Sequence, residues 1–265
     1  MMIGMLIRSQ SDTDRRREAG ELSEWAVRAY AELCDKVADE AFPCTFGTTA
    51  LKQGEILFAF IEATEEPAVI DELVGALTEY AEFVASQSIV RASMQPLAIL
   101  MLPPPAWGTV EAYYDNSWRL LAAVHERDPA PWPARVPADP DSPDWSFCFG
   151  GVPLFINFKT PRHRARRSRR TAHCYLWLVQ ARDGFDVVAG DTVQGRHARH
   201  IIRDKLEAYD RVPTYPALGH YGAPENREWK QYFVPETNEP LGEECPFRAV
   251  RRKRIEKPLI GADSA

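Results

Sequence analysis

The sequence predicts an α/β or α+β fold in which helices pack on a mixed β-sheet within a single domain. Segments with an apolar residue every three or four positions alternate along the chain with short, continuous apolar runs, which are typical of amphipathic helices and buried strands. The chain has 265 residues, of which 45% are hydrophobic, enough for one sizeable core. No internal repeat of about 20 to 50 residues is visible, so a solenoid or a propeller is not expected.

The elements follow one another in a clear order. Helices are predicted over residues 14–39, 67–86, 109–125 and 195–210. Thr109 is predicted to be the N-cap of the third helix. Strands are predicted over residues 54–63, 97–102, 174–180 and 185–190. The runs WSFCFG (145–150) and VPLFINF (152–158) meet at Gly150-Gly151 and predict a β-hairpin.

Three segments are expected to lack regular structure. Residues 128–144 are rich in Pro, Asp, Ala and Ser, and this composition predicts an ordered loop inside the domain. Residues 1–13 and 248–265 are predicted to be flexible ends, and the second of them includes a basic arm. The predicted domain spans residues 1–265.

Composition and motifs exclude several functional classes. The net charge of −6 argues against a nucleic-acid coat protein. No apolar run reaches the roughly 18 residues needed to cross a bilayer, and no secretory signal is visible, so a cytoplasmic protein is expected. The five cysteines lack CxxC spacing, which argues for free thiols. The motifs of dinucleotide-binding folds, P-loops, zinc proteases and α/β-hydrolases are absent.

The strongest local signal is the basic segment TPRHRARRSRR, residues 160–170. On a helix that begins after Pro161, the side chains of His163, Arg167 and Arg170 would share one face. Guanidinium groups bind carboxylates and phosphates bidentately, and imidazole carries protons and ligates metals. The segment therefore predicts an anion or metal site. The alternative is a solvated basic surface that binds RNA.

Two further segments carry reactive or polar groups. In FPCTFG, residues 42–47, Cys44 directly follows a helix, where a thiol is a candidate metal ligand or nucleophile or, alternatively, part of the core. The run GHYGAPENREWKQYF, residues 219–233, is dense in polar and aromatic residues and lacks helical periodicity. We expect it to form a pocket wall or a packed segment that satisfies its own polar groups.

Three segments together resemble the YqcI/YcgG-like family: FPCTFG near residue 42, GGVPLFINFKTPRHRARRSRR at 150–170, and YGAPENREWKQYF with CPF within 221–247. The order and distances of these blocks match, and the resemblance extends from about Phe42 to Phe247. It implies an α/β protein that binds haem b. Several family members are associated with oxidation of guanidino or other nitrogen groups.

The resemblance also suggests how haem would be held. His163 is the expected axial ligand of the iron, with His220 or the Cys44 thiolate as alternatives. The expected partners of the haem propionates are Arg166, Arg167 and Arg170. No CxxCH motif is present, so the haem would lack thioether links.

The leading expectation is a haem-dependent oxidoreductase, resembling a monooxygenase, that acts on a nitrogen-containing guanidino or amino small molecule. A cationic substrate needs a carboxylate and an aromatic face, and Glu228 with Trp229 is the nearest such pair. The alternative is a non-catalytic binding protein whose basic segment holds an anionic ligand or nucleic acid. A second copy of the chain, in a homodimer, is one further candidate partner. The sequence leaves the substrate, the oxidant and the electron donor open.

Overall fold

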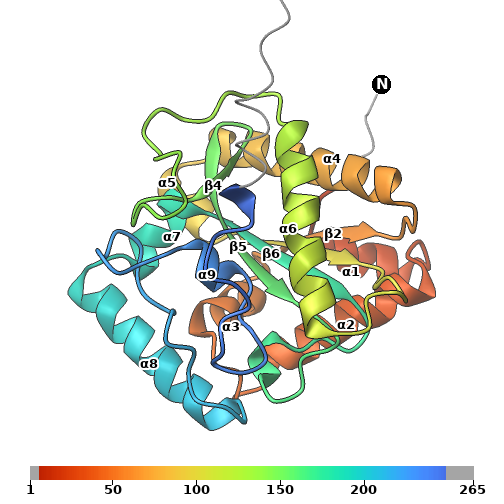
Figure 1. Ribbon diagram of the computed structural model, residues 1–265. Helices are drawn as coiled ribbons and strands as arrows, with labels where there is room; N and C mark the ends of the chain where they lie inside the picture. Colours follow the sequence, from red (N-terminus) through yellow and green to blue (C-terminus); the bar gives the residue numbers. More distant parts are fainter. Residues whose placement is uncertain (1–5, 249–265) are drawn as a thin grey trace, which may run out of the picture.

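The structure is a computed structural model that describes residues 6–248 (Figure 1). A six-stranded sheet with strand order β1-β2-β3-β6-β5-β4 runs through the molecule. Its strands are β1 (Arg8–Ser9), β2 (Leu57–Ile61), β3 (Leu97–Met101), β4 (Phe147–Phe149), β5 (Val152–Lys159) and β6 (Tyr175–Ala181). Strands β2 and β3 are parallel and all other neighbours are antiparallel, which confirms the predicted mixed sheet.

Helices lie on both faces of the sheet, and together they form a single-domain α/β fold, as predicted. The helices of the described residues are α1 (Gln10–Glu18), α2 (Glu24–Ala38), α3 (Thr45–Lys52), α4 (Glu66–Ser86), α5 (Ile89–Ser93), α6 (Val110–Glu126), α7 (Arg182–Ala189), α8 (Val193–Tyr209) and α9 (Trp229–Tyr232). A short 3-10 helix, η1, spans Arg167–Arg169.

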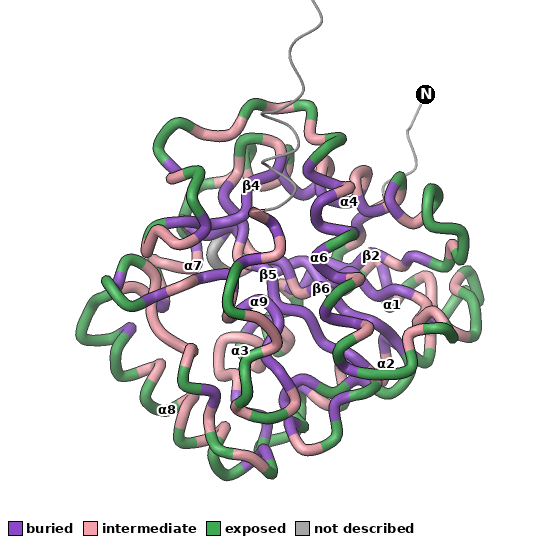
Figure 2. Tube along the Cα trace, in the orientation of Figure 1, coloured by how far each residue is buried: buried purple, intermediate pink, exposed green. Residues whose placement is uncertain are grey.

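The larger part of the core lies between α4, α6 and one face of the sheet. Because side chains alternate along a strand, β5 contributes Leu154, Ile156 and Phe158 to this face. These residues are fully buried and pack with aromatic side chains of β6 and α6. Figure 2 shows the buried strands in the middle of the molecule and the exposed turns of α8 at its edge.

The opposite face of the sheet is covered less completely. A second, smaller cluster joins α2 and α3 to β2, β3 and β6, with Tyr30, Phe58 and Leu176 among its buried members. Strand β5 contributes no residue to this cluster. Strand β5 therefore has side chains on this face that the smaller cluster does not cover.

Several local predictions are confirmed. The Thr109 hydroxyl accepts a hydrogen bond from the Ala112 N–H at 3.1 Å and caps α6. Gly150 and Gly151 have φ values of 59° and 74°, the left-handed conformation that a tight hairpin turn between β4 and β5 requires. The helices expected over residues 67–86 and 195–210 correspond to α4 and α8.

Two predicted elements are wrong. The helix expected over residues 14–39 is two helices, because Gly20 adopts a φ of 71° and the Ser23 hydroxyl caps a new helix, α2. The strand expected over residues 185–190 is part of helix α7, whose Phe185 ring stacks on Phe155 of β5 at a centroid distance of 5.3 Å. A short apolar run does not distinguish a strand from a buried helical turn.

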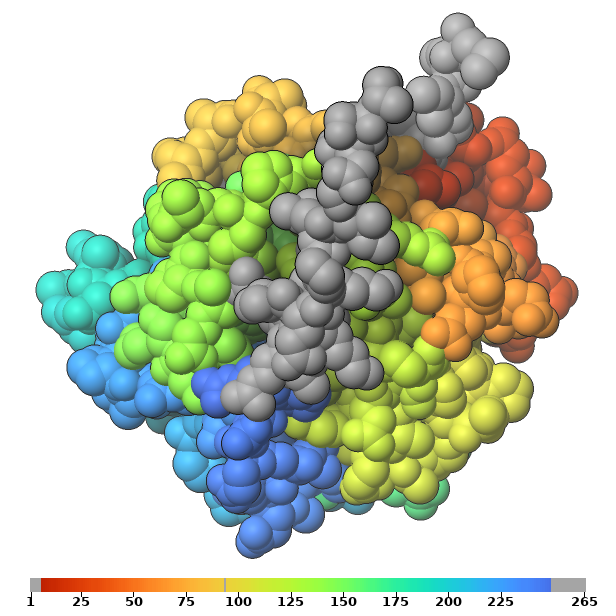
Figure 3. Space-filling model, turned by 45° about the horizontal axis from the view of Figure 1, so that its top comes forward, coloured from red at the N-terminus to blue at the C-terminus, as the bar shows by residue number. Residues whose placement is uncertain are grey.

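The chain segments outside the regular elements have defined positions. The proline-rich segment, residues 128–144, packs beside the C-terminal part of the described chain, with Trp132 stacked on Phe247 and Arg248 paired with Asp139 at 2.7 Å (Figure 3). Residues 8–13, predicted to be flexible, form β1 and the beginning of α1. The N–H groups of Leu6 and Ile7 bond to the Glu79 carboxylate at 2.8 and 2.9 Å. Residues 1–5 and 249–265 of the predicted ends lie outside the described residues. No helix within residues 6–248 has the length and apolar character needed to cross a bilayer.

Candidate functional site

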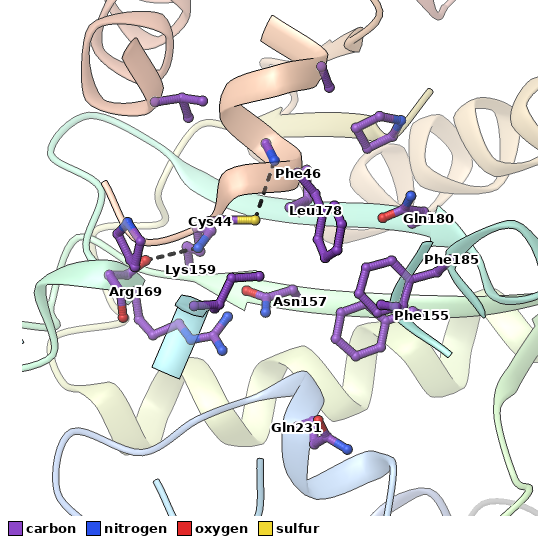
Figure 4. Close-up of a pocket in the computed structure, with 18 of the residues that line it drawn as sticks. Cys44, Phe46, Phe155, Asn157, Lys159, Arg169, Leu178, Gln180, Phe185 and Gln231 are labelled. Carbon is purple, nitrogen blue, oxygen red and sulfur yellow. Dashed lines mark hydrogen bonds between the residues drawn. The ribbon is translucent and has the colours of Figure 1, made fainter. Parts of the chain in front are cut away.

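A cavity of about 470 Å³ lies on the incompletely covered face of the sheet, between β5, β6 and the helices α2, α3, α7 and α8 (Figure 4). Known small-molecule and cofactor sites have volumes of about 300–1,000 Å³. Apolar side chains form much of its wall, including Leu33, Phe42, Ile56, Leu176 and Leu206. The cavity is therefore the candidate ligand site of the described chain.

Strand β5 gives the cavity two chemically different ends. Phe155, Asn157 and Lys159 are alternate residues of the strand and line the cavity in that order. Figure 4 shows Asn157 between the two others, with Phe185 beside Phe155. One end of the cavity is therefore aromatic and the other is cationic, with an amide between them.

The cationic end contains Lys159 and Arg169, both about nine-tenths buried. The Lys159 ammonium donates to the backbone oxygen of Ser168 at 2.9 Å, and burial together with the charge of Arg169 holds the pKa of Lys159 well below its ordinary value. Burial also lowers the pKa of Arg169 to about 10. Within residues 6–248, the Arg169 guanidinium makes no hydrogen bond or ion pair.

The basic segment does not form the predicted helix. The Thr160 N–H donates to the Arg169 oxygen and the Thr171 N–H donates to the Thr160 oxygen, both at 3.0 Å. These bonds close residues 160–171 into a loop that contains η1. His163, Arg167 and Arg170 therefore do not share one face.

His163 lies outside the cavity and is fully buried. Its Nδ1 atom is hydrogen-bonded to the Thr160 hydroxyl and its Nε2 atom to the Val234 oxygen, both at 3.0 Å. Burial lowers the pKa of His163 to about 3, and nearby cations such as Arg169 add to this effect. To ligate iron in the cavity, the ring would have to break these bonds and turn, so the geometry does not favour His163 as the haem ligand.

The three arginines expected to bind propionates lie in different places. Arg166 is buried outside the cavity, where its Nε donates to the Pro235 oxygen at 2.7 Å. The Arg167 guanidinium stacks on the Tyr209 ring at 4.5 Å, also outside the cavity. Arg170 lines the cavity and is exposed. The loop thus separates residues that the expected helix would have brought together.

Cys44 lines the cavity at its cationic end, where it is the N-cap of α3. Its sulfur accepts a hydrogen bond from the Gly47 N–H at 3.4 Å. The thiol is electrostatically coupled to both Lys159 and Arg169. A partly buried thiol that lines a cavity beside two cations is a candidate metal ligand or nucleophile.

Glu228 lines the cavity, whereas Trp229 packs against Trp118 in the core and does not line it. The Glu228 carboxylate is fully buried and paired with the Arg182 guanidinium. Burial raises the pKa of Glu228, and the charge of Arg182 opposes that rise. The rings of Phe155, Phe185 and Tyr221 surround Arg182 at 4.8–5.2 Å. The charge of Glu228 is therefore already balanced by an arginine of the chain itself.

Three residues of the cavity were not predicted to be site residues: Asn157, Lys159 and Arg169. The alternation of VPLFINFK offers a signal for the first two, because a strand with Leu154, Ile156 and Phe158 in the core must turn Asn157 and Lys159 to the other face. The position of Arg169 depends on the loop, which no periodicity indicates. Among residues 6–248, no group of three or more His, Cys, Asp or Glu side chains is arranged to hold a metal ion. The Cys and His side chains that line the cavity are Cys44, Cys174 and His220, and burial raises the pKa of the Cys174 thiol.

Comparison with known proteins places the chain in a family. The family model described as the YqcI/YcgG family matches residues 33–248. The chain belongs to this family. Its relatives include the uncharacterised protein YcgG of Bacillus subtilis strain 168, which is 37% identical over 86% of this chain and 89% of its own length. The uncharacterised protein YqcI of the same strain is 33% identical over 92% of this chain and 94% of its own length.

A third relative carries a functional name. The putative N(omega)-hydroxy-L-arginine synthase DcsA of Streptomyces lavendulae is 34% identical over 86% of this chain and 85% of its own length. That name describes oxidation of a guanidino nitrogen. No solved structure matches the chain.

Proposed function

We propose that this protein is an enzyme that oxidises a guanidino or amino nitrogen of a small molecule, with haem b bound in the cavity. The observation that carries the proposal is the cavity itself, which combines ligand-sized volume and apolar walls with two thiols and an imidazole. The family and the name of DcsA support the same type of reaction.

The residues of the cavity fit a haem group. Haem requires apolar surroundings, one axial ligand and cations for its two propionates. The apolar wall and the ligands Cys44 and His220 are present, and Arg170 at the cavity is a candidate propionate partner. Among these candidate ligands we favour Cys44, because its thiol lies at the N-terminus of α3 at the cationic end of the cavity.

Bound haem would supply an iron centre able to activate oxygen. In the reaction one atom of dioxygen converts an N–H bond of the substrate to N–OH, and the other leaves as water. An external reductant supplies two electrons, which two protons accompany. The stacked rings of Phe155 and Phe185 exclude water from the aromatic end, and the Arg182–Glu228 pair fixes the wall behind them.

A haem titration of the purified full chain tests the proposal. We expect a Soret band that saturates at one haem per chain in the wild type and in Cys34→Ser, a control thiol in α2 outside the cavity. Cys44→Ser should change the spectrum and abolish the red-shifted band that thiolate-ligated haem shows with carbon monoxide after reduction. Loss of haem in His220→Ala, with an unchanged Cys44→Ser spectrum, would assign the ligand to the imidazole instead. A wild-type protein that gives no Soret band would contradict the proposal.

A further inference from the structure

The cationic end of the cavity has more positive than negative charge. Lys159 and Arg169 are buried there, and Asp210 is the neighbouring buried acid. The Asp210 carboxylate already accepts the Ser168 N–H at 2.6 Å and the Ser168 hydroxyl at 2.7 Å. Arg169 therefore holds a buried charge without a bonded counter-ion, an arrangement that costs free energy unless a ligand supplies the anion.

A second group at the same place also lacks a partner. Asn157 is 7% exposed and lines the cavity, and no described group bonds to its Oδ1 atom. The side chain follows Phe155 and precedes Lys159 on the cavity face of β5, and Figure 4 shows it beside Arg169. A primary amide in this position can donate or accept a hydrogen bond, depending on its rotation.

We propose that Lys159, Arg169 and Asn157 form a carboxylate-binding subsite. The planar fork of a guanidinium matches the two oxygens of a carboxylate, and the ammonium and amide supply further donors. The inference rests on the proposed function for the rest of the ligand. A substrate whose carboxylate binds at this end extends its guanidino group along β5 towards Phe155 and Phe185. The substrate class is therefore a guanidino compound with a carboxylate, such as an amino acid. A haem propionate is the other source of the same chemistry.

The test compares L-arginine with agmatine, which has the same guanidino group and no carboxylate. Dissociation constants are measured by calorimetry on the full chain for the wild type, Arg169→Gln, Arg169→Lys and the control Arg164→Gln. Arg164 is an exposed arginine of the same loop outside the cavity. We expect Arg169→Gln to weaken L-arginine binding about tenfold or more and to leave agmatine binding unchanged. Arg169→Lys should recover part of the loss.

A parallel titration with haem b and with haem dimethyl ester, whose propionates are blocked, identifies the source of the carboxylate. Weaker haem b binding in Arg169→Gln, with unchanged binding of the ester, would assign the subsite to a propionate. The subsite would be overturned if every variant bound each of the four ligands with the affinity of the wild type. Failure of both Arg169 variants to fold would also overturn it, because the cation would then be structural. A wild type that binds L-arginine through Arg169 but takes up no haem would contradict the proposed function and leave the subsite in place.

Discussion

Burial of the His163 ring lowers its pKa and makes the stability of the fold depend on pH. Both ring nitrogens are bonded inside the protein, and the cations Lys159, Arg166 and Arg169 act on the ring. The folded-state pKa of about 3 lies below the ordinary value of 6.5, so the unfolded chain takes up the proton first as pH falls. Stability contributed by the neutral ring is complete above pH 6.5 and is lost between about 6.5 and 3.

We expect His163→Gln, which does not titrate, to lose this pH dependence. Between pH 7.5 and 5.5 the wild type should lose about 1.4 kcal/mol more unfolding free energy than the variant. Urea unfolding at the two pH values measures the difference. Parallel losses in the two proteins would show that the ring is accessible to protons in the folded state.

Glu228 is a buried carboxylate, and its pairing with Arg182 favours a structural role. We expect Glu228→Gln to lower the free energy of unfolding by about 1.5–3 kcal/mol, because the buried Arg182 guanidinium then keeps only the partly exposed Asp186 carboxylate, at 3.1 Å, as its counter-ion. The control is Asp183→Asn, which breaks the exposed pair with Arg135 and should cost less than about 1 kcal/mol. Similar small losses in both variants, with loss of substrate binding in Glu228→Gln alone, would restore Glu228 as the substrate carboxylate.

Individual residues of the basic segment could be predicted only in part. The sequence identified a cluster of guanidinium groups but not which of them would reach a ligand. Arg166 and Arg167 bond to neighbouring segments, whereas Arg169 faces the cavity. That division depends on bonds between Thr160 and residues 169 and 171, and such a loop leaves no periodic pattern.

Strand β5 has one face in the core and the other face in the cavity. Its apolar residues fill one face, and Asn157 lies on the other without a partner for its oxygen. We expect Asn157→Leu to raise the free energy of unfolding by about 1–3 kcal/mol, because the buried oxygen is removed. The same variant should bind L-arginine more weakly.

The control for this prediction lies one residue away on the same strand. Ile156→Asn places an amide in the core and should lower the unfolding free energy by several kcal/mol, about 3 or more. Urea unfolding and calorimetry of both variants make the comparison. If Asn157→Leu destabilises the protein, the amide has a structural role and not a ligand role.

Helices and strands whose apolar residues recur at a clear spacing could be predicted from the sequence. Elements that depend on tertiary contacts could not. The spacing of apolar residues in 67–86 identifies α4, whose buried face packs in the larger cluster. The apolar run at 185–190 is compatible with a strand and with a buried helical turn. It is helical in the structure, where Phe185 stacks on Phe155. The short helices α3 and α9 lack enough residues for a period and were not predicted.

The fold class of the molecule could be predicted from segments of helical and strand-like hydrophobic patterning that alternate along the chain. The cavity could not be predicted from this patterning. The cavity lies where α2 and α3 pack on β2, β3 and β6 but not on β5, whose cavity face meets α7 through Phe155 and Phe185. This depends on strand order, which places β5 between β6 and β4. Hydrophobic patterning indicates which residues are buried but not which strands become neighbours.

We propose that the protein oxidises a guanidino nitrogen of its substrate with haem bound in the cavity. The most direct measurement is mass spectrometry of the haem-loaded full chain after incubation with L-arginine, a reductant and labelled dioxygen. We expect a product with one labelled oxygen on a guanidino nitrogen, formed by the wild type and by Cys34→Ser but not by Cys44→Ser. A haem-loaded wild type that gives no oxygenated product from L-arginine or agmatine would contradict it.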